Sequence, residues 1–488
     1  MGDLSIQRIP TGVAGLDVIL DGGLVARQAY LVRGGMGTGK TTLGLHFLTE
    51  GARRGESALF ITLMKREAEV RLHAASMGFD LHGVSLLDLS PTPALFSEMQ
   101  TSHIFTSAEV ERAPFTQKIT AHIQAIRPRR ICVDAITQLR YLAVDELEFR
   151  RLTLAFLRFL QAQDATVLFT AEVSGTVSEE SLPFLCDGVI TLKKTPEGRS
   201  IEVEKLLGSG FHPGHHSLRL NETGMTVFPK LVVPEKQVQP FTGEIIPSGV
   251  PELDGLIDGG IERGMITIIS GPSGTGKSLL SLLFAKESAT RGERSAIFLF
   301  EETRDPLLKR AERLGMPLEQ MLAEGTLSVT HVMPDRYLPD EFTMLVRREV
   351  EEHGARMVVI DSLAGYQKTL HGEEFSSSII DLCTYLKAWG VTVILINDVE
   401  AVTGDFRVTE VHISYLADNI IFLRYLEVRG QLRKAIGVLK KRMSHFEQTL
   451  RELIITDNGI VVGEPLTDLR GILLGVPEWV GPSKEREA

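Results

Sequence analysis

The 488-residue sequence lacks most of the features that would assign it to a secreted or membrane-bound class. It contains three cysteines, Cys132, Cys186 and Cys383, whose scattered spacing fits neither a metal site nor a disulfide framework. No apolar run approaches the roughly 18 residues of a membrane-spanning helix. The first residues, MGDLSIQRIP, have no apolar signal-peptide core. We therefore expect a cytoplasmic protein with reduced thiols and no membrane partner.

An excess of positive charge is also absent. The 52 Lys and Arg residues are outnumbered by 63 Asp and Glu residues, which gives a formal net charge of −11 at pH 7. Proteins that bind nucleic acid broadly along their surface are usually basic. The composition therefore argues against a nucleic-acid partner, although it leaves room for a local basic groove.

What the chain does have is a long internal repeat. IPTGVAGLDVILDGG begins at Ile9 and IPSGVPELDGLIDGG begins at Ile246, an offset of 246 − 9 = 237 residues. Short solenoid repeats have periods of about 20–50 residues, so this offset indicates the duplication of a whole domain. We predict a first domain at residues 1–232, a second at 233–470 and a flexible C-terminal tail at 471–488.

Within each copy, short apolar runs such as AYLVRG and TVLFTA alternate with longer segments of helical periodicity such as RRLTLAFLRFLQAQ. That alternation is typical of βαβ units. The predicted fold class of each domain is α/β, with a mostly parallel sheet covered by helices. The segments EVEKLLGSGFHPGHHSLRL and GVLKKRMSHFEQTLREL follow the alternating part of each copy, and we predict that they add terminal antiparallel strands.

Each copy carries a phosphate-binding loop motif. GGMGTGKT and GPSGTGKS both match G-x-x-x-x-G-K-[ST], after an apolar strand and before a helical stretch. In such loops backbone N–H groups converge on phosphate oxygens, the lysine contacts the β- and γ-phosphates, and the hydroxyl residue holds Mg²⁺. We therefore expect ATP and Mg²⁺ as cofactors. The expected nucleotide-binding residues are Gly34, Gly35, Gly37, Thr38, Gly39, Lys40, Thr41 and Thr42 in the first copy and Gly271, Ser273, Gly274, Thr275, Gly276, Lys277, Ser278 and Leu279 in the second.

An apolar strand in each copy ends in aspartate, RRICVD at Asp134 and RMVVID at Asp361. A carboxylate in this place can bind the Mg²⁺ shell together with the loop hydroxyl. Many strands end in Asp, so the prediction depends on the phosphate loop upstream. The expected metal-site residues are Thr41 and Asp134 in the first copy and Ser278 and Asp361 in the second.

The two copies differ after the next strand. At the 237-residue offset, Met64 and Lys65 of FITLMK align with Glu301 and Glu302 of FLFEE. A carboxylate at the carboxyl edge of a parallel sheet can take a proton from an attacking water or hydroxyl, which Met and Lys cannot do. The alternative is that the two glutamates only begin a solvated helix. We interpret the first domain as a nucleotide-binding domain with a slow or silent hydrolase site, in which Glu172 is a candidate substitute carboxylate.

These motifs together resemble the KaiC family of circadian-clock ATPases and autokinases, which are RecA-like ATPases. The resemblance includes IPSGVPELDGLIDGG, the FEE after the next strand, and VTEVHISYLADNIIFLRYLEVRGQLRKAIGVLKKRMSH. It implies a homohexamer with ATP between neighbouring subunits and with clock or signalling proteins as partners. It also implies that Glu301 and Glu302 are the catalytic glutamates of the second domain, acting with the phosphate contact of Lys277.

The resemblance extends to the cations near the end of each domain. It implies that Lys440 and Arg442 reach the ATP of a neighbouring subunit. An arginine suits that task because its fixed-charge fork can stabilise phosphate charge. In the first domain Lys205 is kept, whereas Leu207 replaces the arginine. The first domain therefore departs from the family at its acidic pair and at one of the two cations.

In the family, adjacent hydroxyl residues of the second domain take phosphate from ATP across the subunit boundary. The resemblance implies that Ser414 is the first acceptor, with Tyr415 standing where Thr or Ser is expected, and that Thr409 matches a position linked to phosphate movement. The tyrosine hydroxyl lies several ångströms further from the backbone, which argues against a two-site phosphorylation cycle.

The predicted function is therefore an ATPase and serine/threonine autokinase of a hexameric clock or signalling type. One alternative is a RecA- or RadA-like DNA-associated ATPase, because fold alone cannot separate the two. The acidic balance and the absence of an aromatic-and-basic binding segment argue against it. Another alternative is a nucleotide-gated scaffold with little turnover.

Overall fold

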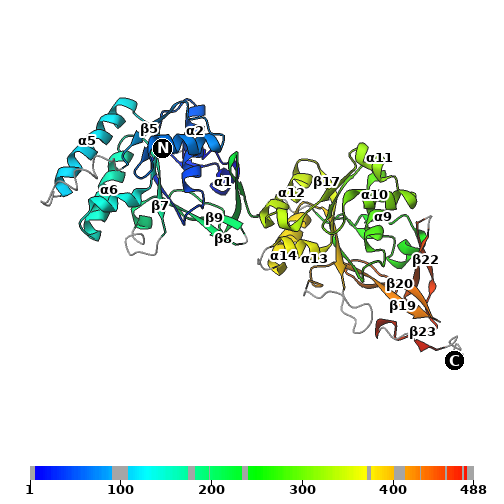
Figure 1. The fold of residues 1–488 in the computed structure, drawn as a ribbon. Coiled ribbons are helices and arrows are strands. Elements are labelled where there is room, and N and C mark those ends of the chain that lie inside the picture. Colours follow the sequence, from blue (N-terminus) through cyan, green and yellow to red (C-terminus); the bar gives the residue numbers. More distant parts are fainter. Residues whose placement is uncertain are drawn as a thin grey trace. The chain divides into compact units, whose positions relative to one another are not determined.

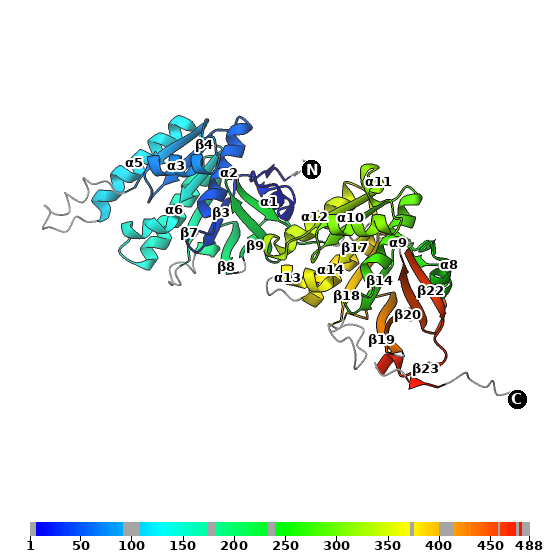
Figure 2. The same ribbon diagram turned by 45° about the vertical axis from the view of Figure 1, so that its right-hand side comes forward.

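The structure is a computed structural model that describes residues 6–90, 108–173, 182–196, 198–232, 240–370, 375–399, 413–428, 430–456, 459–474 and 478–480. Thr409 and most of the predicted tail lie outside these residues. The chain divides into two compact units, Met1–Lys230 and Leu231–Ala488, which we call the first and second units. Figure 1 and Figure 2 show that each unit is built around its own central sheet.

The first unit contains a nine-stranded sheet in the order β11-β10-β9-β8-β3-β7-β6-β4-β5. The strands from β8 to β5 in this order are parallel to one another, and β9, β10 and β11 continue the sheet in antiparallel pairs. The strands are β3 (Ala29–Gly34), β4 (Ala58–Thr62), β5 (Val84–Asp88), β6 (Arg130–Asp134), β7 (Thr166–Glu172), β8 (Gly188–Thr195), β9 (Gly198–Leu206), β10 (His216–Asn221) and β11 (Gly224–Phe228), with a separate short pair β1 (Arg8–Ile9) and β2 (Leu24–Val25). The helices are α1 (Ala14–Ile19), α2 (Lys40–Arg53), α3 (Glu67–Ser76), α5 (Ala108–Ile126), α6 (Glu146–Gln161) and the 3₁₀ turns η1 (Ile136–Leu142) and η2 (Leu182–Leu185).

The second unit repeats this arrangement. Its sheet has the order β16-β15-β17-β18-β14-β19-β20-β21-β22, which read backwards matches the first unit strand for strand. The strands are β14 (Ile266–Gly271), β15 (Arg294–Leu299), β16 (Leu327–His331), β17 (Ala355–Asp361), β18 (Thr392–Asp398), β19 (Asn419–Val428), β20 (Gln431–Lys441), β21 (Arg451–Thr456) and β22 (Gly459–Pro465), with short pairs β12 (Ile245–Ile246) and β13 (Ile261–Glu262), and β23 (Leu469–Arg470) and β24 (Glu478–Trp479). The helices are α8 (Pro251–Leu256), α9 (Lys277–Thr290), α10 (Arg304–Arg313), α11 (Leu318–Ala323), α12 (Pro339–Glu351), α13 (Leu363–Thr369), α14 (Phe375–Ala388) and the 3₁₀ turns η3 (Pro334–Arg336) and η4 (Ile472–Leu474).

Helices cover both faces of each sheet (Figure 2), which explains why the strands read as continuous apolar runs. All five residues of β4 are buried. In the first unit one apolar core lies between the sheet and α1, α2 and α3, and a second lies on the α5 and α6 side. In the second unit the corresponding cores lie against α8 to α11 and against α12 to α14. In each unit the central strand, β3 or β14, is therefore packed between two apolar cores.

The predicted fold class is confirmed in both units. The parallel βαβ strands and the antiparallel terminal strands occur where the apolar runs and the two tail segments predicted them. The three cysteines are free and buried. Among the described residues, no helix is both long enough and apolar enough to cross a membrane.

Candidate functional site

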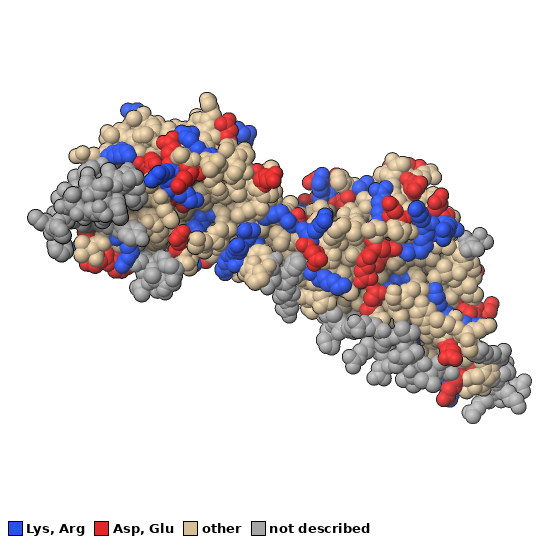
Figure 3. Space-filling model, viewed as in Figure 1, with Lys and Arg blue, Asp and Glu red and all other residues tan. Residues whose placement is uncertain are grey.

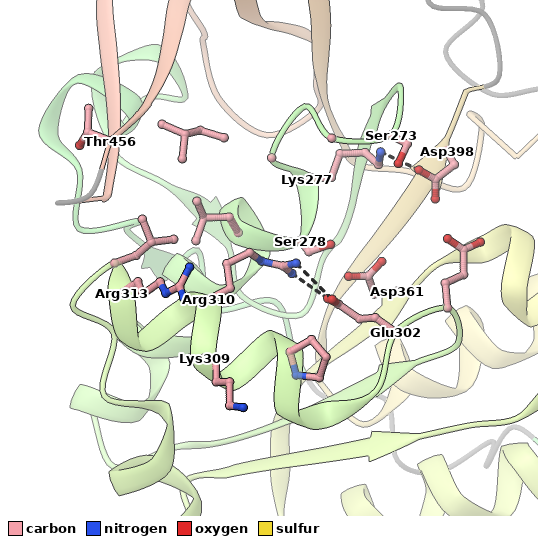
Figure 4. Close-up of a pocket in the computed structure, with 17 residues that line it drawn as sticks. Ser273, Lys277, Ser278, Glu302, Lys309, Arg310, Arg313, Asp361, Asp398 and Thr456 are labelled. Carbon is pink, nitrogen blue, oxygen red and sulfur yellow. Dashed lines mark hydrogen bonds and ion pairs between the residues drawn. The ribbon is translucent and has the colours of Figure 1, made fainter.

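A cavity of about 750 Å³ opens at the carboxyl edge of the second unit's sheet (Figure 4). One wall is the phosphate loop between β14 and α9, with Ser273, Gly274, Gly276, Lys277, Ser278 and Leu279. The strand ends supply Asp361 and Asp398, the segment after β15 supplies Glu301 and Glu302, and α10 supplies Lys309, Arg310 and Arg313. Strands that are far apart in sequence thus place their charged and hydroxyl side chains at one edge of the sheet, as expected when the strands are parallel.

The loop geometry suits a bound phosphate. Gly276 precedes α9 with φ 112°, a left-handed conformation that favours glycine, and a Cβ there would lie 2.8 Å from Ile455. The Lys277 ammonium is buried, donates to the Pro272 carbonyl at 2.8 Å and lies 2.6 Å from the Asp398 carboxylate. The partial positive charge of the α9 N-terminus faces the same cavity. The loop therefore concentrates positive charge and backbone donors where an anion would enter.

Asp361 is the carboxylate best suited to a cation. Burial raises its pKa to about 6, and a hydrogen bond from Ser278 opposes that rise, while the neighbouring charges of Asp398 and Glu302 add to it. A hydroxyl beside a buried carboxylate is an oxygen pair of the kind that Mg²⁺ accepts. A divalent cation would offset the repulsion among these acids, so the residues present fit the predicted ion.

The two glutamates that follow β15 are held differently. Glu302 accepts two hydrogen bonds from the Arg310 guanidinium, at 2.7 and 3.1 Å (Figure 4). Glu301 accepts one from the Ser362 hydroxyl at 3.1 Å and is exposed. On the face drawn in Figure 3, basic side chains gather where α10 lies, with acidic side chains beside them. The cavity edge thus offers an oriented carboxylate next to a basic helix.

A second cluster contains the predicted phosphoacceptors and the two terminal cations. Lys440 donates to the Ser414 carbonyl at 3.0 Å, and Arg442 donates to the Tyr415 carbonyl at 2.8 Å. Ser414 and Tyr415 are both exposed. None of these four residues is among those that line the cavity of the same chain. Within one chain the predicted acceptors therefore lie outside the lining of the phosphate-loop cavity.

The buried Asp418 anchors this cluster to the sheet. Its carboxylate lies 3.4 Å from Arg442 and 3.0 Å from Lys387. The same carboxylate accepts the backbone N–H of Ile266 at 3.0 Å, and the Asp418 N–H donates to the Ile266 carbonyl at 2.8 Å. Ile266 is the first residue of β14. Asp418 therefore joins Arg442 to the strand that ends in the phosphate loop.

The first unit keeps the phosphate-binding parts. Lys40 donates to the carbonyls of Gly34 and Gly35, each at 2.7 Å, and Thr41 donates to the Asp134 carboxylate at 2.7 Å. Gly39 precedes α2 with φ 108°, close to the value for Gly276. In both units the loop hydroxyl is therefore hydrogen-bonded to the strand-end carboxylate, and the loop lysine donates to a loop carbonyl.

Strand register shows which residues correspond elsewhere. Thr62 pairs with Asp134 and Leu299 pairs with Asp361, so the 237-residue offset holds through β4 and β15. Lys65 therefore stands where Glu302 stands. It is half-buried, and in the described part of the chain the structure gives its ammonium no hydrogen bond or ion pair. The predicted contrast between the acidic pair and the Met-Lys pair thus falls at equivalent places.

Glu172, the candidate substitute carboxylate, has a different counterpart. It pairs with Gly34 at the end of β7, as Asp398 pairs with Gly271 at the end of β18. Burial lowers the pKa of Lys40, and Glu172 is the largest of the charges that oppose this shift. Glu172 is thus the counterpart of the lysine-binding Asp398, and it does not occupy the place of Glu301 or Glu302.

The first unit also has a counterpart of the phosphoacceptor cluster. The Asp187 N–H donates to the Ala29 carbonyl and the Asp187 carboxylate accepts the Ala29 N–H, as Asp418 does with Ile266. Lys205 donates to the carbonyls of Pro183 and Cys186, at 3.2 and 2.7 Å. Counting back from these aspartates, Pro183 and Phe184 take the places of Ser414 and Tyr415. The first unit therefore has neither acceptor hydroxyl.

Several residues predicted to bind nucleotide make contacts within their own unit instead of lining a cavity that the structure describes. The Thr38 and Thr275 hydroxyls turn back to the carbonyls of Gly35 and Pro272, and Thr42 is buried against Met77. Gly271 ends the strand beneath the loop. Three residues that shape the site were not predicted from the sequence: Asp398, Arg310 and Asp418. Each of them contacts a residue of another helix, strand or loop, which the sequence does not reveal. Only Asp398 had a recognisable sequence pattern, because it ends an apolar strand.

Comparison with known proteins agrees with this duplicated architecture. A sequence model of the KaiC ATPase family matches residues 9–232 and again residues 246–467. The chain belongs to the KaiC family of ATPases. A circadian clock oscillator protein KaiC from Parasynechococcus marenigrum is 27% identical over 500 residues, covering 99% of this chain and 96% of that protein.

Other KaiC proteins match over a similar extent. A circadian clock oscillator protein KaiC from Prochlorococcus marinus is 29% identical, covering 98% of this chain and 96% of that protein. A circadian clock protein KaiC3 from Synechocystis sp. is 28% identical over the same shares. As a KaiC-family ATPase, this chain is a nucleotide-binding protein with the family's two phosphate-loop domains.

Proposed function

We propose that the second unit of this KaiC-family ATPase hydrolyses ATP and also phosphorylates Ser414 of a neighbouring copy, within a hexameric ring of the clock or signalling type. The observation that carries the proposal is the meeting of Lys277, Ser278, Asp361 and Glu302 around one cavity. The first unit has Lys65 in place of the glutamate. We propose that it holds ATP and turns it over slowly or not at all.

In the second unit Lys277 would contact the β- and γ-phosphates, and the backbone N–H groups of the loop would bind their oxygens. Mg²⁺, if held through Ser278 and Asp361, would offset phosphate charge. Glu302 would take the proton from the attacking water while the bond from the γ-phosphorus to the bridging oxygen breaks. ADP would leave with that electron pair.

Autophosphorylation uses the same machinery with a different acceptor. The Ser414 hydroxyl is exposed and lies outside the cavity of its own chain, which favours transfer from a neighbour's ATP. Lys440 and Arg442, beside Ser414, would then approach the same phosphates. The new phosphate would add about −1.5 to −2 charges at a subunit boundary and alter its packing or partner affinity. Such a signal fits the clock names of the relatives.

Mass spectrometry of the purified chain after incubation with Mg-ATP tests the kinase part directly. Phosphate is expected mainly on Ser414, because the longer Tyr415 side chain would place its hydroxyl beyond the transfer point. Hydrolysis without any incorporated phosphate would leave an ATPase and remove the autokinase.

Light scattering tests the assembly. With a slowly hydrolysed ATP analogue a species of about six chains is expected, and removal of nucleotide should dissociate it, because neighbouring subunits share the nucleotide. A strict monomer at micromolar concentration with saturating Mg-ATP would contradict the ring.

A further inference from the structure

The Arg310–Glu302 pair gives the proposed base one fixed orientation. Two guanidinium nitrogens meet the two carboxylate oxygens at 2.7 and 3.1 Å, the parallel arrangement visible in Figure 4. Such bidentate pairs add geometric specificity as well as energy. A glutamate has three side-chain torsions, and two parallel hydrogen bonds select one of their combinations. The carboxylate still has lone pairs left to accept a proton.

The arginine comes from a packed helix. It lies in the second turn of α10, and this helix buries Leu307, Leu308 and Ala311 in the core. Glu302 lies in the irregular segment between β15 and α10. A packed helix therefore presents the guanidinium to a carboxylate that belongs to a non-helical segment. Lys309 and Arg313 line the same cavity, but in the described part of the chain the structure gives Glu302 no partner other than Arg310.

The duplicated unit changes both members of the pair. At the offset 310 − 73 = 237, Arg310 corresponds to His73, just as Glu302 corresponds to Lys65. Burial lowers the pKa of His73, and the charge of Lys65 adds to that lowering. A guanidinium at position 73 would face this ammonium at the place where the second unit has the Glu302 carboxylate. The arginine thus occurs in the unit that has the glutamate and is missing from the unit that lacks it.

We propose that Arg310 is a positioning residue for ATP cleavage, which holds the Glu302 carboxylate against the oxygen that attacks the γ-phosphate. The inference rests on the proposed function of the second unit. During hydrolysis the water oxygen bonds to phosphorus and one water proton moves to Glu302, while the bond to the bridging oxygen breaks and ADP keeps its electron pair. Arg310 exchanges no proton; it fixes where the accepting oxygen stands.

The test is steady-state ATP hydrolysis by the full-length chain carrying Arg310→Gln or Arg310→Lys. A misplacement of about 1 Å can cost roughly 10²-fold in rate, so Arg310→Gln should lower kcat by about tenfold or more. KM for ATP should change by less than about threefold, because the contact is with the glutamate. Arg310→Lys keeps the positive charge but can make only a single contact with the carboxylate. Its kcat should lie between those of the wild type and Arg310→Gln.

A double-mutant cycle separates positioning from nucleotide binding. In the Glu302→Gln background, Arg310→Gln should cause no further loss of kcat, because the carboxylate it orients is gone. Arg313→Gln removes a charge from the same wall without touching Glu302. Its effect, whatever its size, should persist in that background.

Two results would overturn the inference. One is an unchanged kcat with a raised KM in Arg310→Gln, which would make Arg310 a nucleotide ligand. The other is a full additional loss in the double variant. Failure of the proposed function looks different, because Lys277→Ala would then leave turnover intact.

Discussion

The two units of this chain share one scaffold and differ in the groups that would act on a bound nucleotide. Both have the same strand order and a lysine and a hydroxyl in the phosphate loop. Both also have an aspartate at the end of the strand two places from the central strand in the sheet, β6 in the first unit and β17 in the second. The differing pairs, first unit first, are Met64 and Glu301, Lys65 and Glu302, His73 and Arg310, Pro183 and Ser414, and Leu207 and Arg442. On our proposal, binding a triphosphate and cleaving it depend on separate sets of residues in one fold.

The strongest test of that separation replaces the equivalent residues one at a time. Glu302→Gln keeps the size of the side chain and removes the proton acceptor, so ATP turnover should fall by at least about 10²-fold. Lys65→Gln, the matched change in the first unit, should leave most of the turnover. Phosphate release from assembled protein measures both. Equal losses in the two variants would mean that the units share the chemistry.

The acceptor sites allow a second test. Ser414→Ala should remove most of the phosphate that the chain incorporates from labelled ATP while sparing hydrolysis, because water can still attack. Tyr415→Phe is the control and should keep most of the label. Full labelling in Ser414→Ala would place the acceptor elsewhere.

Much of the fold and of each site could be predicted because the signals are local. The phosphate loops are continuous motifs, and β3 has the bounds of the apolar run AYLVRG. The contrast of Lys65 with Glu302 was also readable, since the 237-residue offset holds from the start of each repeat through α3 and α10.

The remainder depends on contacts across the sheet that no fixed offset reveals. Asp361 and Asp134 are separated by 361 − 134 = 227 residues, and Asp418 and Asp187 by 418 − 187 = 231, so insertions and deletions shift the alignment. Glu172 could therefore be matched to its counterpart only through its register with Gly34. Arg310 reads as one more charge on a solvated helix until the structure brings it to Glu302.

A gain of function would sharpen the comparison further. Met64→Glu with Lys65→Glu, in a chain silenced by Lys277→Ala, gives the first unit an acidic pair. Turnover should then rise by roughly three- to tenfold over the silenced parent, and full activity is not expected because Leu207 remains. The same assay with Met64→Gln and Lys65→Gln controls for the loss of the ammonium. No gain beyond that control would show that the acidic pair alone is not the missing element.

Mild acid should affect the first unit more than the second. The His46 ring accepts a hydrogen bond from the Met225 N–H at 2.8 Å, and burial lowers its pKa from 6.5 to about 4. The unfolded chain therefore takes up the proton first, so the stability of the first unit falls as pH drops from 6.5 toward 4, by about 1–3 kcal/mol.

Leu283 holds the equivalent place in the second unit, at 283 − 46 = 237. Hydrogen exchange of the full chain at pH 5 and pH 7.5 should therefore show faster opening, after correction for intrinsic rates, in the first unit. His46→Leu should reduce that difference. Equal acceleration in both units would assign the effect to other groups.

Asp418 has a consequence for a ring of such chains. One of its partners, Arg442, is proposed to face the nucleotide of the next subunit, and another, Ile266, begins the strand that ends in the phosphate loop of the same chain. In such a ring a buried carboxylate would link each nucleotide site to the site of the next subunit. A change at one of the six sites could then pass to its neighbour around the ring. ATP binding to the second units should accordingly be cooperative, with a Hill coefficient above one. The first units, where Leu207 interrupts the connection, should fill independently.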